Sequence, residues 1–123
     1  MVESLTIKTI KTMNYRLIEV DEKFYKSCIH KDIIRMGLAE RYGLKEIALS
    51  ILCNELPLSK REIRDCIVYN GAQLCFAPSS SIVKSERHEK WLDTYFSVSE
   101  NGIVFLLFNP DGENKIYIVE EVS

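Results

Sequence analysis

In the last third of the chain, apolar positions either alternate with polar ones or form an unbroken run, and both patterns predict β-strands. Residues 94–99 and 103–108 flank an Asn-Gly pair at Asn101, which is preferred in two-residue hairpin turns because both central residues take positive φ. Residues 103–108 are apolar at every position, which is typical of a strand buried on both faces in the middle of a sheet. A third strand is predicted over 115–120, so residues 94–123 form a three-stranded antiparallel meander.

A spacing of three and four residues between apolar positions predicts helices in the middle of the chain. Residues 44–56 keep one apolar stripe and end at Pro57, because proline disfavours helical geometry in the residue before it. Ser59 and Glu62 have the spacing of a capping box, in which each side chain accepts a hydrogen bond from the other residue's amide. A second helix is therefore predicted over 59–70, where an Asn-Gly pair ends it.

The remaining segments mix the two patterns. β-Branched residues over 4–12 and alternation over 15–20 predict two strands, while residues 21–43 have helical spacing. Residues 73–76 are interpreted as a loop or a short strand, and residues 82–93 as a further helix.

These elements predict an α+β fold in one domain over residues 1–123. Its parts are N-terminal strands and a helix (1–43), a helical, helix-turn-helix-like centre (44–93) and the C-terminal three-stranded antiparallel meander (94–123). An alternative arrangement adds the N-terminal strands to the same sheet and packs the helices on one of its faces. A chain of 123 residues is long enough for one hydrophobic core and too short for two.

Composition excludes several classes of protein. Apolar residues make up 46% and charged residues 28% of the chain, which are values of a folded globular protein. No apolar run approaches the roughly 20 residues of a membrane helix, and the first residues lack the pattern of a signal peptide. We therefore expect a cytoplasmic protein without a membrane partner.

Cysteine and histidine positions give little support for a metal or catalytic site. Cysteines stand at positions 28, 53, 66 and 75 without a C-x-x-C pair, and we expect most of them to be small core residues. Zinc is the alternative, because Cys28 and His30 are closely spaced and His88 lies further on. A zinc site normally has two pairs of closely spaced ligands, and this sequence has only one such pair. Neither histidine stands in a recognisable catalytic motif, and no glycine loop fits a phosphate. We expect no catalytic residue, no metal and no cofactor.

Charge is unevenly spread along a chain whose net charge is −2. Residues 93–123 contain six Asp or Glu and one basic residue, Lys115. Such an acidic surface steers a protein toward a basic partner. One functional prediction is therefore a small acidic inhibitor, immunity-type protein or adaptor that binds a basic protein without catalysis. Its candidate contact residues are Asp93, Asp111, Glu113, Glu120 and Glu121.

The helices predicted at 44–56, 59–70 and 82–93, followed by a hairpin, stand in the order of a winged helix-turn-helix domain. Ile47–Leu52 resembles its first helix, and Leu58–Ile63 resembles its second. Pro78–Val83 with Lys90–Leu92 resembles the recognition helix of small transcriptional regulators. The resemblance covers roughly residues 44–120.

This resemblance implies a regulator that binds double-stranded DNA as a homodimer, because one recognition helix reads few base pairs. The third helix is then expected in the major groove, and the N-terminus of the second helix near phosphates. The candidate DNA-binding residues are Ser59, Lys60, Arg61, Ser79, Ser80, Lys84, Arg87, His88 and Lys90.

Overall fold

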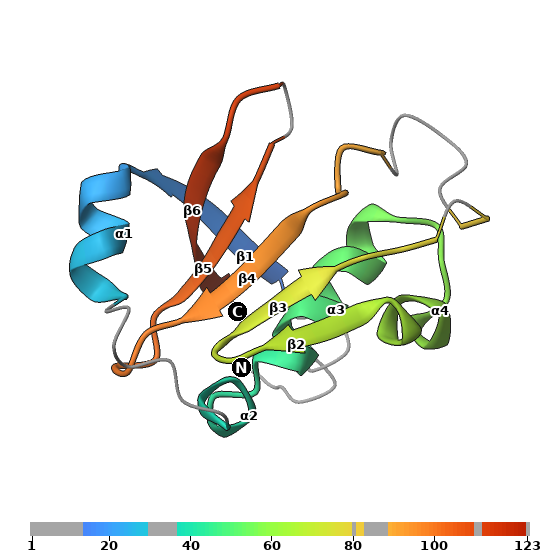
Figure 1. The fold of residues 1–123 in the computed structure, drawn as a ribbon, viewed down its shortest axis with the longest axis horizontal. Coiled ribbons are helices and arrows are strands. Elements are labelled where there is room, and N and C mark those ends of the chain that lie inside the picture. The colour runs from blue at the N-terminus through green and yellow to red at the C-terminus, as the bar shows by residue number, and fades with distance from the viewer. Residues whose placement is uncertain (1–13, 30–36, 80, 83–88, 110–111, 123) are drawn as a thin grey trace, which may run out of the picture.

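A computed structural model describes residues 14–29, 37–79, 81–82, 89–109 and 112–122, which have an α+β fold (Figure 1). The described residues form a six-stranded antiparallel sheet in the order β1-β6-β5-β4-β3-β2. The strands are β1 (Asn14–Val20), β2 (Ile67–Asn70), β3 (Gln73–Phe76), β4 (Thr94–Val98), β5 (Val104–Phe108) and β6 (Lys115–Val122). The helices are α1 (Glu22–Cys28), α2 (Leu38–Arg41), α3 (Leu44–Glu55) and α4 (Lys60–Asp65).

The predicted arrangement of a helical centre with a three-stranded C-terminal meander is wrong. Strands β4, β5 and β6 lie where they were expected, but they are only half of the sheet. The first described strand, β1, pairs with β6 along its whole length, from Asn14 opposite Val122 to Val20 opposite Ile116. On the other side, the hairpin β2–β3 continues the sheet from β4.

The centre of the chain departs from the prediction after α4. The capping box of Ser59 and Glu62 begins this helix as expected, with both hydrogen bonds present. The helix ends at Asp65 rather than at residue 70, because the β-branched and aromatic residues of β2 pair with β3 instead. Gly71, with φ of 63°, lies in the tight turn between these two strands rather than at a helix end.

The turn between β4 and β5 also differs in detail from the predicted two-residue hairpin. Only Gly102 has positive φ, at 89°, and Asn101 does not. The Ser99 amide donates to the Ile103 carbonyl, and the Gly102 amide donates to the Ser99 carbonyl. This is the longer hairpin loop that places one glycine in the left-handed region after an ordinary turn.

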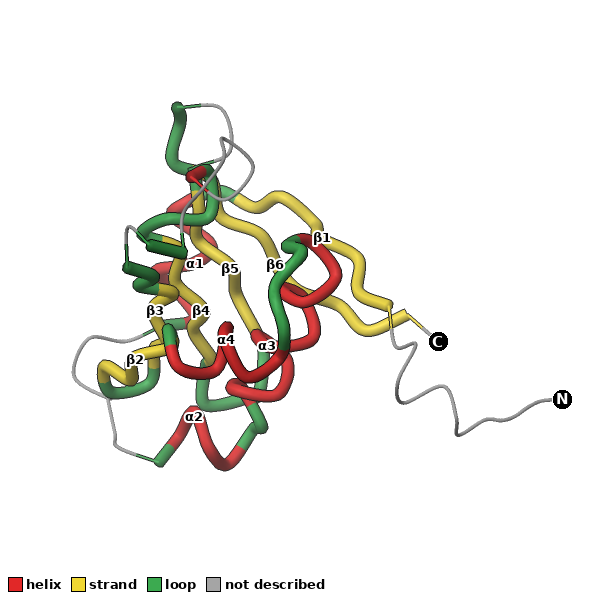
Figure 2. Tube along the Cα trace, turned by 90° about the vertical axis from the view of Figure 1, so that its right-hand side faces the viewer, coloured by secondary structure: helices red, strands yellow, loops and turns green. Residues whose placement is uncertain are grey.

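Helices α2, α3 and α4 are grouped together, with α1 set apart from them (Figure 2). The side chains of α3 pack on one face of the sheet, where Leu52, Phe96 and Leu106 are almost completely buried. Trp91 joins this core by stacking on Phe108 with ring centroids 4.5 Å apart.

Helix α1 lies on the opposite face of the sheet and covers Phe105. The ring of Phe105 is fully buried, and the rings of Tyr25 and Phe24 lie over it with centroids 5.0 and 6.3 Å away. The Tyr25 hydroxyl shares a hydrogen bond of 3.2 Å with Ser97 Oγ, and Gln73 Nε2 donates to both hydroxyls. This contact fixes α1 over one part of the face.

Two predicted elements lie partly or wholly outside the described residues. The strand predicted over 4–12 lies outside them, and so do residues 83–88 of the helix predicted over 82–93. Residues 90–93 form turns rather than the end of that helix, and β4 begins directly after them.

Candidate binding surfaces

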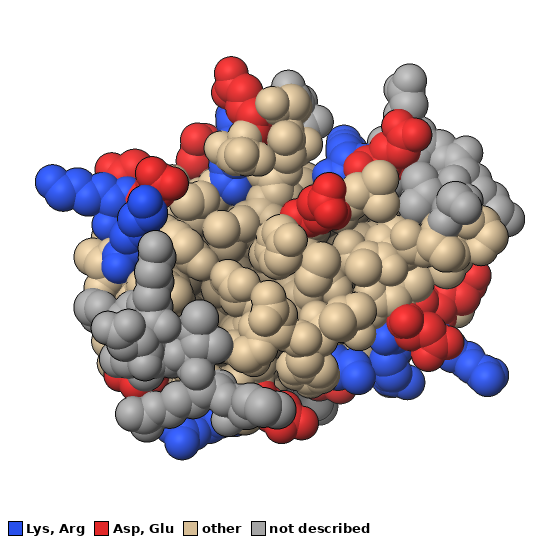
Figure 3. Space-filling view, viewed as in Figure 1, with Lys and Arg blue, Asp and Glu red and all other residues tan. Residues whose placement is uncertain are grey.

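One row of uncharged side chains crosses all six strands on the face that carries α1. We call this row the open row, because α1 lies over the neighbouring row that contains Phe105. Its most exposed member, Val68 on the edge strand β2, is 54% exposed to solvent. Figure 3 shows uncharged side chains over the middle strands of this face, with charged side chains around them. The open row consists of Val68, Cys75, Tyr95, Leu107, Ile116 and Val20.

Acidic side chains border one end of the open row. A hollow of about 770 Å³ lies there, with Val20, Tyr95, Leu107 and Ile116 among its lining residues. Four acidic residues and one lysine also line it, so the border is negative. The side chain of Glu19 points to the other face of the sheet, because Glu19 is paired with Tyr117 and its neighbour Val20 belongs to the open row. We call the rest of this group the acidic rim; its carboxylates are Asp21, Glu22 and Asp93, and its ammonium group is that of Lys115.

The polar members of the open row stay uncharged at neutral pH. Tyr95 and Cys75 are opposite each other on β4 and β3, and their side chains share a hydrogen bond. The neighbouring Cys75, burial and the charge of Asp93 all raise the pKa of Tyr95. Burial and Asp93 likewise raise the pKa of the Cys75 thiol, although Tyr95 opposes this. The row therefore presents apolar surface and neutral hydroxyl and thiol groups.

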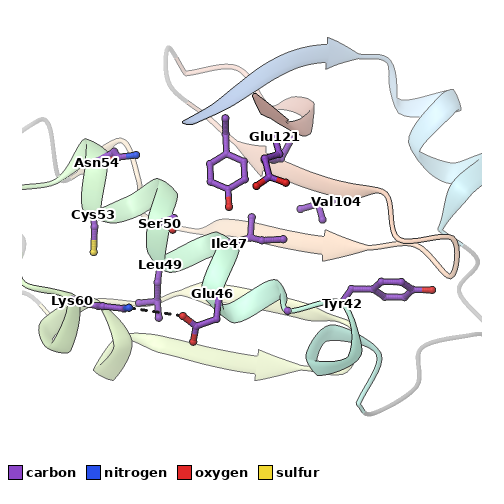
Figure 4. A pocket seen from close by; sticks show the side chains of 13 residues that line it. Tyr42, Glu46, Ile47, Leu49, Ser50, Cys53, Asn54, Lys60, Val104 and Glu121 are labelled. Atoms are coloured by element: carbon purple, nitrogen blue, oxygen red, sulfur yellow. Dashed lines mark ion pairs between the residues drawn. The ribbon is translucent and has the colours of Figure 1, made fainter. Parts of the chain in front are cut away.

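A second concave site lies on the other face of the sheet, between α3 and the strands β5, β6 and β1 (Figure 4). We call it the α3 cleft; its volume is about 810 Å³. It exists because α3 packs mainly against β3 and β4, whereas β1 and β6 continue the sheet beyond the helix. Ile47 of α3, Val104 of β5 and Val119 of β6 supply its apolar surface.

Polar groups meet at the β1–β6 end of the α3 cleft. The Tyr15 hydroxyl shares a hydrogen bond with the Ser50 side chain of α3, and the Glu121 carboxylate lies near the phenol. Burial and the negative charge of Glu121 raise the pKa of Tyr15, although the bond to Ser50 opposes them. Tyr15 therefore keeps its proton at neutral pH.

The other end of the α3 cleft contains an ion pair between α3 and α4. Lys60 Nζ lies 3.9 Å from Glu46 Oε2, and the dashed line in Figure 4 marks this contact. Cys53 lines the cleft nearby. Burial raises the pKa of its thiol, although the charges of Lys60 and Arg64 oppose this. The thiol is thus poorly suited to act as a nucleophile at neutral pH.

The candidate DNA-binding residues are not brought together on one described surface. Ser59 accepts a hydrogen bond from the Glu62 amide, and Lys60 pairs with Glu46. Arg61, Ser79 and Lys90 are exposed. Lys84, Arg87, His88 and Ser80 lie outside the described residues. The segment 94–123, which the resemblance implies as the wing, forms the strands β4, β5 and β6, which are paired on both sides with further strands of the sheet.

The acidic candidates divide between several places. Asp93 belongs to the acidic rim and Glu121 to the α3 cleft, on opposite faces. Glu120 forms an ion pair with Arg16 of β1. Glu113 is exposed in the turn before β6, and Asp111 lies outside the described residues.

Sequence reasoning missed both the open row and the α3 cleft. The signal for the row was present, because residues 115–120 are apolar on both faces of the strand. The residues of the row on β1 and β3 come from distant segments, and only the pairing of six strands aligns them with Ile116 of β6. Tyr15 and Ser50 of the cleft are likewise 35 positions apart in the chain.

Within the described ranges, no three His, Cys, Asp or Glu side chains gather as a metal ion requires. All four cysteines are free thiols, of which Cys66 is buried. No helix among the described residues has both the length and the apolar character needed to cross a bilayer.

No protein-family model, curated protein or solved structure matches this chain.

Proposed function

We propose that this chain is a protein-binding module, and that its partner docks on the open row beside the acidic rim. The supporting observation is the continuous uncharged row across six strands, bordered by the acidic rim. Exposed apolar surface bordered by polar residues is characteristic of protein interaction sites.

The charge of the rim defines the chemistry of the partner. Carboxylates of Asp93 and Asp21 beside apolar side chains favour a partner that presents apolar residues next to Lys or Arg. Such an arrangement combines burial of the row with electrostatic steering of the encounter. This proposal is the acidic binder of the sequence analysis, with the contact moved from the whole acidic third to one face.

Neighbouring positions on β2 provide a test. Val68 and Tyr69 are similarly exposed, at 54% and 42%, but their side chains lie on opposite faces of the sheet. A photo-crosslinking residue is placed at one position or the other in the full chain, in cells that express it. We expect a specific crosslinked protein from position 68 and none from position 69.

The crosslinked segment of that protein is then sequenced, and it should contain apolar residues next to Lys or Arg. Asp93→Asn removes one charge of the rim, and asparagine tolerates the φ of 57° found there. This variant should weaken crosslinking more at low salt than at high salt. Equal amounts of the same crosslinked protein from positions 68 and 69, or a crosslinked segment that is acidic, would overturn the proposal.

DNA binding stays a prediction, and the same protein tests it. Binding to mixed duplex fragments that falls steeply with salt, and is lost in a Lys60→Glu, Arg61→Glu variant, would support it. Binding to DNA without any crosslinked protein at position 68 would favour the regulator over the protein-binding module.

A further inference from the structure

We infer that the α3 cleft is a second binding site, for an organic cation at the end of an aliphatic chain. A primary amine of this kind occurs both in a free diamine and in a lysine side chain of another protein. The inference is independent of the proposed function, because the cleft and the open row lie on opposite faces of the sheet.

The carboxylate of Glu121 is the group that would receive the cation. It lines the cleft beside the phenol of Tyr15, and its negative charge contributes to the raised pKa of that phenol. The ion pairs among the described residues involve Glu22, Glu46 and Glu120, and none of them involves Glu121. A cation beside this carboxylate is attracted by its charge, and the neutral phenol does not oppose the attraction.

The apolar surface of the cleft suits the chain that carries the cation. Ile47, Val104 and Val119 line the cleft together with Glu121. An alkyl chain of four or five carbons can cover such surface while its charged end stays hydrated near the carboxylate. Anions are disfavoured, because the two carboxylates of the cleft face only one ammonium group, which Glu46 already contacts.

Glu120 provides a matched control for Glu121. The two residues are neighbours near the end of β6, so their side chains point to opposite faces of the sheet. Glu120 is paired with Arg16 on the face away from the cleft. Replacing either residue by glutamine removes one negative charge from the same strand, but only Glu121→Gln removes it from the cleft.

The experiment is a titration of the full chain, followed by nuclear magnetic resonance, with 1,5-diaminopentane and with N-acetyl-lysine methylamide. The neutral control ligand is 1-pentanol and the anionic one is hexanoate. We expect both amines to shift signals of residues around the cleft and the two controls to bind more weakly. Glu121→Gln should weaken amine binding about fivefold, the upper range for an ion pair of an exposed carboxylate such as this one, and Glu120→Gln should leave it unchanged.

The pKa of Tyr15 is a second readout that does not depend on affinity. Glu121→Gln should lower this pKa, because it reduces the negative potential at the phenol. Tighter binding of the lysine derivative indicates a protein side chain as the natural ligand, and tighter binding of the diamine indicates a free amine. Binding of 1-pentanol as strong as that of the amines, or equal losses in both glutamine variants, would refute the site.

Discussion

Gly102 and Gly112 form a matched pair that separates backbone strain from side-chain contact. Their φ values are 89° and 87°, so an L-residue is similarly strained at either position. Among the described residues, space is available at Gly112, where none of them lies within 4 Å of an added Cβ. At Gly102 the added Cβ would lie 3.0 Å from Tyr42 Cε1, and the Tyr42 hydroxyl donates to the Glu100 carbonyl.

These geometries set the expected loss in free energy of unfolding. Gly112→Ala should cost about 1–2 kcal/mol, the usual penalty of left-handed backbone for a residue with a Cβ. Gly102→Ala should cost that amount plus about 0.5–1.5 kcal/mol, because the ring of Tyr42 has to move and weaken its hydrogen bond. The loss of glycine's freedom in the unfolded chain is common to both variants and cancels in the difference.

Urea unfolding of the two variants measures this difference by linear extrapolation. A Tyr42→Ala background tests its cause, since without the ring Gly102→Ala should cost no more than Gly112→Ala. Equal losses for both alanine variants in the otherwise unchanged chain would refute the role assigned to Tyr42.

Other perturbations have equally definite outcomes. Ser59→Ala should cost about 0.5–2 kcal/mol in urea unfolding, because it removes the cap of α4. Thr94→Val should be neutral or stabilising by about 1 kcal/mol, since the buried Oγ1 has no hydrogen-bond partner among the described residues. Tyr25→Phe should speed hydrogen exchange in α1, because the bonds to Ser97 and Gln73 are lost. Stability should fall as pH rises above about 9, because the unfolded chain releases protons before the folded one does; urea unfolding at two pH values checks this. The groups whose pKa is raised in the folded chain are Cys53, Cys66, Cys75, Tyr15, Tyr69 and Tyr95.

Sequence patterns predicted elements whose signals are local. The capping box at Ser59 was found correctly, because its two hydrogen bonds join residues three positions apart. Strand β5 was recognised as central from its unbroken apolar run. Pro57 ended α3 as expected, with Leu56 in an extended conformation.

Elements that depend on distant pairing were predicted wrongly. Residues 67–70 follow a helix without a break in apolar spacing, and they become β2 only because β3 lies beside them. The acidic rim and the α3 cleft also depend on the pairing of distant strands, so the sequence alone could not predict them. Tyr15 and Glu121 are far apart in the chain, and they meet because β1 and β6 are paired.

The place of β1 in the sheet has a consequence for the order of folding. In the described sheet β1 is bonded only to β6, and the ion pair between Arg16 and Glu120 joins residues 104 positions apart. During synthesis the earliest of these strands therefore has no partner until the latest has left the ribosome. We expect its amides to gain protection last when refolding is followed by hydrogen exchange.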